Sequence, residues 1–292
     1  MREFHVLNLG AGVQSTCLFL LAREPNAKLR FDIAIFADTG EEPAAVYKHL
    51  DYLRSLDHPE IWIRSAGKLG DDLIHGVNST GQRFASIPAF TAEDHLIRPG
   101  SCEHRLPPAP KYGMVRRQCT SEYKIRVIEK AIRREIVGLK PRQWMPKDVK
   151  VYQYFGITTD EKQRAERAKR RFEKTPWAIP VYPFLEMGWC RQDCLNWLKD
   201  RLPHPVPRSA CVFCPYRTNK EWLHLKQTDP IGWDRAVQID HALRQDGTVA
   251  NRRLTQKLYL HRSCLPLDVV DLGHEKTLFR PMTNECQGMC GV

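Results

Sequence analysis

The chain has 292 residues, of which 45 are Lys or Arg and 34 are Asp or Glu, so its formal net charge at pH 7 is +11. Hydrophobic residues make up 42% of the chain, enough for a sizeable core, which argues against global disorder. No apolar stretch approaches the roughly 20 residues that a membrane-spanning helix needs, and the N-terminus lacks a signal-peptide pattern. We therefore expect a cytoplasmic protein without a membrane partner, whose ten cysteines serve metal binding or catalysis rather than disulfides.

Two short segments carry the whole charge imbalance. Residues 111–142 have a net charge of +7 and residues 162–174 a net charge of +5, so the rest of the chain is close to neutral. Either segment alone could be the solvated face of a helix. Two such segments on a neutral body indicate a binding surface for a polyanion, without distinguishing DNA, RNA and a small polyphosphate.

Strands and helices alternate in the first part of the chain. The patterns predict a strand over residues 4–9, a helix from residue 14, a strand over 33–37, a helix over 43–55 and a strand over 61–63. The run at 33–37 is continuously apolar, as expected of a strand buried on both faces. This order predicts a parallel sheet with right-handed crossovers, whose ligands bind beyond the carboxyl ends of the strands.

The later part of the chain is less regular. Residues 76–118 are rich in Gly, Pro and Ser and are expected to be irregular, whereas residues 149–155 suggest another central strand. Short helices are expected near residues 191–199 and 218–227. A longer helix begins at about Ser121, and its apolar stripe is expected to consist of Ile125, Ile128, Ile132 and Ile136.

The predicted fold class is α/β, with a parallel twisted sheet, helices on both of its faces and a Cys-containing C-terminal extension. Residues 1–225 are expected to form the main domain. Residues 226–292 are expected to be a helical extension and a Cys-containing tail that pack on the same domain.

The turn between the first strand and the first helix has the makings of a phosphate-binding loop. Small residues let backbone N–H groups approach an anion, the helix N-terminus offers the positive end of its dipole, and two hydroxyl groups follow. A glycine-containing turn of this kind can equally be purely structural. No Gly-Lys-Ser/Thr follows, so the turn is not a Walker A loop. Its sequence is Gly10-Ala11-Gly12-Val13-Gln14-Ser15-Thr16.

This loop resembles the PP-loop of the adenine nucleotide alpha-hydrolase superfamily. More specifically, the chain is similar to the phosphoadenosine phosphosulfate reductase-like branch of the ATP pyrophosphatases. The loop differs from the usual pattern at Gly10, Ala11 and Gln14, where that family has Ser, Gly and Asp. Four later segments match the family motifs in order, namely Ala37–Glu41, Arg117–Ile125, Gly156–Arg164 and Ser209–Arg217.

The resemblance implies a fold of this superfamily and a site for ATP and Mg²⁺. Catalytic roles would fall to Gln14, Ser15, Asp160 and, by a loose similarity of the tail to sulfonucleotide reductases, Cys286. Arg164 could instead belong to the outer face of a basic helix. The residues expected to bind the nucleotide or its metal are Gly10, Gly12, Gln14, Ser15, Thr16, Asp38, Thr39, Lys124, Gly156, Arg164 and Arg217.

The cysteines suggest a metal centre. Cys211 and Cys214 form a C-x-x-C pair, for which zinc, iron–sulfur and redox dithiol interpretations compete. In the resembled family, a cysteine before the helix and a later C-x-x-C commonly hold a [4Fe-4S] cluster, and the matching residues here are Cys119, Cys211 and Cys214. The fourth position would be left open or filled by Cys102, Cys286 or Cys290. Zinc is the alternative metal.

The leading hypothesis is an ATP pyrophosphatase that activates a nucleic acid for sulfur incorporation, of the DNA phosphorothioation or tRNA thiolation type. DNA is favoured because the chain has no separate RNA-binding module, and a cysteine desulfurase is a plausible sulfur-donor partner. The alternatives are a reductase of phosphoadenylylsulfate or adenylylsulfate, and a non-catalytic iron–sulfur or zinc protein that binds nucleic acid.

Overall fold

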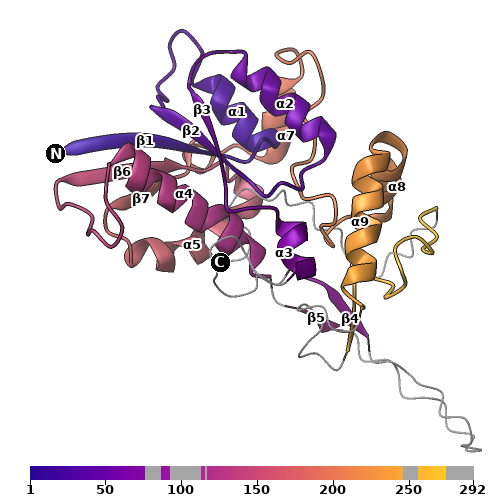
Figure 1. Ribbon diagram of the computed structural model, residues 1–292. Coiled ribbons are helices and arrows are strands. Elements are labelled where there is room, and N and C mark those ends of the chain that lie inside the picture. The colour runs from indigo at the N-terminus through magenta and orange to yellow at the C-terminus, as the bar shows by residue number, and fades with distance from the viewer. Residues whose placement is uncertain (76–86, 93–112, 116, 246–255, 274–292) are drawn as a thin grey trace, which may run out of the picture. The chain divides into compact units, whose positions relative to one another are not determined.

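A computed structural model describes residues 1–75, 87–92, 113–115, 117–245 and 256–273 of the chain (Figure 1). The predicted helical extension and tail over residues 226–292 are described only in part, and Cys102, Cys286 and Cys290 lie outside the described residues. No helix in the described ranges is long and apolar enough to cross a membrane.

The chain forms two compact units, which are considered separately. The first unit comprises Met1–Ala66 and Thr120–Ala210, and the second comprises the described parts of Gly67–Cys119 and Cys211–Thr283. This division differs from the expected boundary near residue 225. The reason is that strands from both segments of the second unit pair with each other, which joins parts of the chain that are far apart in sequence.

The first unit contains a five-stranded parallel sheet, which confirms the predicted α/β class. The pattern of alternating strands and helices located four of the five strands, and the strand over residues 178–181 was not anticipated. The order across the sheet is β3 (Ile61–Ser65), β2 (Ile33–Asp38), β1 (Arg2–Leu9), β6 (Val149–Tyr154) and β7 (Ala178–Val181).

Strand β1 lies at the centre of this sheet. It pairs in parallel with β2 on one side, where Leu9 is opposite Phe36, and with β6 on the other, where Leu7 is opposite Tyr154. β2 and β3 extend the sheet on one side of β1, and β6 and β7 extend it on the other side. The order therefore reverses between β1 and β6, which is the point where open α/β sheets bind their ligands.

Helices cover both faces of the sheet, as predicted (Figure 1). One face packs against α1 (Val13–Leu21), α2 (Ala44–Arg54) and α7 (Arg191–Leu198). The other packs against α4 (Arg126–Ala131) and α5 (Lys162–Glu173). Two single-turn helices complete the unit, η3 (Thr159–Glu161) and α6 (Pro183–Glu186).

The helix predicted from Ser121 contains wide π-helical turns at both ends, η1 (Thr120–Ile125) and η2 (Ile132–Ile136). Ile128 and Ile132 are buried as expected, but Ile125 and Ile136 are only half-buried. Each residue of a π turn is rotated around the helix axis by a smaller angle than in an α turn. The buried stripe therefore shifts to other residues at these two ends. Its remaining members are Thr120, Tyr123, Lys124, Val127 and Ala131.

In its described residues, the second unit combines three helices with a small antiparallel sheet. Its helices are α3 (Leu69–His75), α8 (Asn219–Thr228) and α9 (Pro230–Ala242), and its strands in sheet order are β5 (Gly113–Met114), β4 (Phe90–Ala92) and β8 (Lys257–Tyr259). The expectation of irregular structure over residues 76–118 is therefore wrong at β4 and β5. These strands are too short to show a period in the sequence.

A buried carboxylate holds the second unit together. Asp240 of α9 accepts hydrogen bonds from the backbone N–H groups of Leu260 (2.8 Å) and Leu267 (2.9 Å) and from the guanidinium of Arg244 (2.7 Å). Three donors, one of them charged, compensate the cost of burying the charge.

Candidate functional site

The carboxyl ends of β1 and β6 meet in the middle of the parallel sheet. The turn Gly10–Gly12 follows β1 directly and leads into α1 at Val13, with Ala11 in the left-handed region at φ 56°. Every residue of this turn is buried. The predicted loop therefore lies where the strand order reverses, at the N-terminus of a helix.

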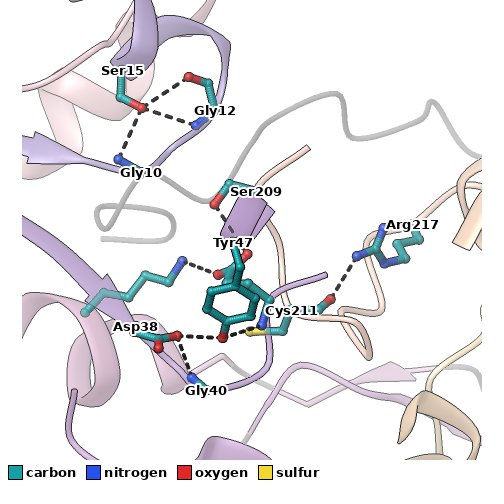
Figure 2. A network of polar contacts seen from close by, with 11 residues as sticks. Gly10, Gly12, Ser15, Asp38, Gly40, Tyr47, Ser209, Cys211 and Arg217 are labelled. Atoms are coloured by element: carbon teal, nitrogen blue, oxygen red, sulfur yellow. Dashed lines mark hydrogen bonds and ion pairs between the residues drawn. The ribbon is translucent and has the colours of Figure 1, made fainter. Parts of the chain in front are cut away.

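Two backbone N–H groups of the turn converge on one oxygen atom (Figure 2). The Oγ of Ser15 accepts hydrogen bonds from the N–H of Gly10 (3.1 Å) and the N–H of Gly12 (3.3 Å), and it donates to the Gly12 carbonyl oxygen (3.2 Å). Inward-pointing N–H groups of this kind form an anion-binding concavity in many phosphate sites. Here the Ser15 hydroxyl fills that concavity.

Gly156, the second residue after β6, packs tightly against the same loop. A Cβ atom on Gly156 would lie 2.9 Å from the backbone carbon of Gln14 and 2.9 Å from the backbone nitrogen of Ser15. Real Cβ atoms do not approach backbone so closely, so only glycine fits here without moving the loop. Gly156 therefore contacts the loop, and its binding of the nucleotide stays a prediction.

A single arginine connects the side chains of Gln14 and Asp160. Arg191, the first residue of α7, donates from Nη1 to the Gln14 Oε1 atom (3.0 Å) and from its backbone N–H to the Asp160 Oδ2 atom (2.8 Å). Gln14 is buried, whereas Asp160 is exposed. Two predicted catalytic residues are thus brought together by a third that was not predicted.

Buried polar atoms gather just after β6. Within the described part of the chain, Thr158 Oγ1 and Glu161 Oε1 are buried and have no hydrogen-bond partner. The other Glu161 oxygen accepts a hydrogen bond of 2.5 Å from Arg164, whose guanidinium is also buried. Arg164 therefore points toward the protein interior and does not belong to the exposed face of α5.

At the end of β2, Asp38 is held by two donors (Figure 2). Its Oδ1 atom accepts from the N–H of Gly40 (2.8 Å) and from the hydroxyl of Tyr47 (2.9 Å). Burial, together with the adjacent Asp38 carboxylate, raises the pKa of Tyr47 well above its ordinary value. The phenol therefore stays protonated and orients the carboxylate, while the neighbouring Thr39 is buried.

Lys124, which was expected to lie beside the nucleotide phosphates, is in a buried ion pair. Its Nζ atom lies 3.4 Å from Glu42 Oε1, and the hydroxyl of Ser209 donates to Glu42 Oε2 (3.4 Å). The side chain of Glu42 is completely buried. Lys124 thus neutralises a buried carboxylate in the first unit.

Thr16 contacts a chain of two histidines. Its hydroxyl lies 2.9 Å from Nε2 of His49, and Nδ1 of His49 lies 2.9 Å from Nε2 of His204. Thr16 and His49 are fully buried, and His204 is partly exposed. Burial first, and then the neighbouring His204, lowers the pKa of His49 to about 4, so this imidazole is neutral near pH 7.

Cys119, Cys211 and Cys214 all belong to the second unit. Cys211 and Cys214 occupy one turn, closed by a hydrogen bond from the Cys214 N–H to the Cys211 carbonyl oxygen (2.9 Å), and all three thiols are half-buried and not in disulfides. Arg217 donates to the same carbonyl oxygen (3.1 Å; Figure 2). Its guanidinium also lies over the ring of Trp222.

The turn presents two thiols, but the described residues contain no group of three or more His, Cys, Asp or Glu side chains placed to hold a metal ion. The predicted cluster set of Cys119, Cys211 and Cys214 is therefore not assembled as one group in the described residues. Cys102, Cys286 and Cys290, the predicted sources of a fourth ligand, cannot be placed because they lie outside them. The iron–sulfur centre stays a prediction.

Sequence patterns missed Arg191, His49 and Glu42. Arg191 begins a predicted helix without any motif, and its two contacts come from segments that are more than 30 residues away. The histidines have no regular spacing, because the contact between His49 and His204 joins positions far apart in sequence. Only Glu42 had a signal, since it directly follows the matched segment Ala37–Glu41.

Comparison with protein-family models, with curated proteins and with solved structures finds no match to this chain in any of the three.

The low pKa of His49 predicts an acid-dependent loss of stability. Between pH 6.5 and about 4 the unfolded chain binds a proton that the folded protein does not, so the unfolding free energy falls with falling pH and levels off below pH 4. This lowering of the His49 pKa corresponds to a change of about 3 kcal/mol in the free energy of unfolding. Urea unfolding of His49→Gln across this range should show a pH dependence smaller by about that amount. The exposed His58→Gln substitution should leave it unchanged. Equal pH dependence in wild type and His49→Gln would refute a neutral buried imidazole.

Proposed function

We propose that the first unit is a PP-loop-type ATP pyrophosphatase that activates a nucleic acid for sulfur incorporation. The observation that carries this proposal is the arrangement at the point where the strand order reverses. There, the N–H groups of Gly10 and Gly12 converge on one oxygen, and Gly156 packs against the same turn. A phosphate oxygen that replaced the Ser15 hydroxyl would receive the same two hydrogen bonds, with the dipole of α1 behind them.

Further support comes from the buried polar atoms after β6. A buried donor or acceptor without a partner costs about 1–3 kcal/mol, so such atoms are rare unless a ligand completes them. Among the described residues, the Thr158 hydroxyl and one Glu161 oxygen are of this kind, and both follow the strand that packs against the loop. A bound nucleotide with its hydrated metal ion offers both donors and acceptors to them.

In the proposed reaction an acceptor oxygen of the nucleic acid attacks the α-phosphorus of ATP. The new P–O bond forms as the bond to the β-phosphate oxygen breaks, so the products are adenylylated acceptor and pyrophosphate. Pyrophosphate leaves with negative charge that must be stabilised in the transition state. Arg191 is the described cation that we place there, because its guanidinium contacts Gln14 of the loop directly.

Carboxylates suited to Mg²⁺ stand at two strand ends. Asp38 is the last residue of β2 and Asp160 lies in η3 after β6, and carboxylate oxygens are the ligands that this cation prefers. When bound, Mg²⁺ would neutralise phosphate charge and orient the leaving group. The hydrogen bonds from Tyr47 to Asp38 and from Arg191 to Asp160 fix the directions of these carboxylates before any ligand arrives.

The sulfur step and the partners form the outer part of the proposal. The thiols of Cys211 and Cys214 on one turn are suited to binding a soft metal or an iron–sulfur centre, with zinc as the alternative. The sulfur itself would come from a donor protein such as a cysteine desulfurase. DNA and tRNA are both suitable acceptors on the basis of charge.

Arg191→Ala should lower pyrophosphate release from ATP by 10- to 100-fold, because it removes the contact that orients Gln14 and a cation beside the leaving group. Gln14→Ala should lower it by a similar factor. Lys199→Ala, an equal charge change at the exposed end of the same helix, is the matched control and should leave the rate unchanged. Pyrophosphate is measured with added DNA or tRNA. Unaltered rates in Arg191→Ala and Gln14→Ala would reject this site, and sulfite release from a sulfonucleotide would favour the reductase alternative.

Protein purified without oxygen should contain iron and acid-labile sulfide, and both should be lost in Cys211→Ser. Cys264→Ser replaces another half-buried thiol of the second unit and should retain them. The measurement is metal and sulfide analysis with the visible absorption spectrum. Colourless wild-type protein that holds zinc would assign the C-x-x-C turn to zinc.

A further inference from the structure

The two basic segments of the sequence lie on neighbouring helices. Helices α4 and α5 pack on the same face of the parallel sheet (Figure 1). Trp177 contacts the apolar clusters beneath both of them. An ion pair of 2.5 Å between Arg171 of α5 and Glu129 of α4 joins the two helices directly. The two basic segments, which are separate in the sequence, therefore lie side by side on one surface of the protein.

The ion pair also shows which flank of α5 faces α4. Successive residues of an α-helix are rotated by about 100° around its axis. This rotation places Arg167, Arg170 and Lys174 on the same flank as Arg171 or on the adjoining outer surface. All three are exposed. The acidic residues of the helix, Glu166 and Glu173, lie on the outer surface beside Arg170 and not on the flank that carries Arg167 and Arg171. The side of α5 nearest α4 is thus uniformly basic.

The facing flank of α4 has the same character. Arg126 precedes Glu129 by three residues and Arg133 follows it by four, which places both on the side of the helix that meets α5. Arg126 is exposed and Arg133 is half-buried. Nearby acidic groups are already neutralised, since Glu129 pairs with Arg171 and Glu135 with Arg64.

An ordered turn extends this surface and presents a tryptophan to solvent. Arg133 donates to the Gln143 carbonyl oxygen (2.6 Å), and the side chain of Gln143 accepts from the backbone N–H of Lys140 (2.9 Å). Trp144 follows directly and is 90% exposed, the highest value among the large hydrophobic residues of the described chain. Lys140 and Arg142 in the same turn are exposed as well. We define the basic face as Arg126, Arg133, Lys140, Arg142, Trp144, Arg167, Arg170 and Lys174.

The basic face is separate from the residues of the candidate site. The turn that carries Trp144 leads into the N-terminal end of β6, where Val149 is opposite Arg2 at the start of β1. The loop and Gly156 lie at the other end of the same strands. Helices α4 and α5 run between the two edges, so their basic flanks lead from one edge of the sheet to the other.

We propose that the basic face binds single-stranded nucleic acid, with arginine and lysine side chains on the phosphates and Trp144 stacked on a base. A solvated indole costs free energy that stacking recovers, and only a single strand offers unstacked bases together with a regular row of phosphates. A duplex would satisfy the cations but would leave the indole unused. Because the bound strand would be the acceptor of the reaction, this inference rests on the proposed function. Binding of the strand itself requires no ATP.

The test measures binding of fluorescein-labelled 20-nucleotide single strands, DNA and RNA, to the full chain by fluorescence anisotropy without ATP. We expect Trp144→Ala to weaken binding by about tenfold at any salt concentration. Reversal of Arg167 and Arg170 to Glu should weaken it at least tenfold at low salt and flatten its salt dependence. Thermal unfolding checks that the exposed substitutions leave the fold intact.

Matched controls lie elsewhere on the described surface. Lys28→Glu with Arg30→Glu makes the same charge change at two exposed residues outside the basic face, and Ile231→Ala truncates an apolar residue that is 84% exposed. Both should bind nearly as wild type does. Unchanged affinity in Trp144→Ala, tighter binding of a duplex than of the single strand, or equal losses in the controls would overturn the proposal.

Failure of this inference is distinguishable from failure of the proposed reaction. Strand binding that depends on Trp144 in a protein that releases no pyrophosphate would retain the basic face and reject the reaction. Pyrophosphate release that depends on Arg191, in a protein whose strand binding ignores Trp144, would do the opposite.

Discussion

The close approach of Gly156 to the turn after β1 is the constraint on which the candidate site depends. A Cβ atom on Gly156, just beyond β6, would lie only 2.9 Å from backbone atoms of Gln14 and Ser15, so the two backbones approach closely. Because β1 and β6 are the strands between which the order reverses, this approach draws the loop, the buried polar atoms after β6 and the start of α7 into one place. Arg191 then joins Gln14 to Asp160, so residues far apart in sequence act on a common site.

The same sheet carries both the candidate site and the proposed strand-binding surface. Parallel strands leave their carboxyl ends to the loops that bind ligands, and the helices that return the chain carry charge along the faces of the sheet. In this chain those returning helices, α4 and α5, contribute the basic flanks, and the turn before β6 adds Trp144 at the opposite edge. Nucleotide chemistry and strand binding can therefore occupy different surfaces of one unit.

Periodicity and turn chemistry predicted the parallel sheet and the loop, because buried strands such as Ile33–Asp38 are continuous apolar runs that end at glycine or aspartate. They failed for β4 and β5, which are too short to show a period, and for Ile125 and Ile136, where π turns shift the buried stripe. Lys124 looked like a ligand-binding cation in the sequence, yet it is buried against Glu42. Arg191 and His49 could not be found, since nothing local marks a contact between distant segments.

The central claim is that the Gly10–Ser15 turn receives the phosphates of ATP. A crystal structure of the full chain with a non-hydrolysable ATP analogue and Mg²⁺ tests it most directly. We predict phosphate oxygens within hydrogen-bond distance of the Gly10 and Gly12 N–H groups, with the Ser15 hydroxyl displaced from its present position and Arg191 close to the β- or γ-phosphate. A nucleotide bound elsewhere, with the Ser15 hydroxyl still accepting both N–H groups, would contradict the claim.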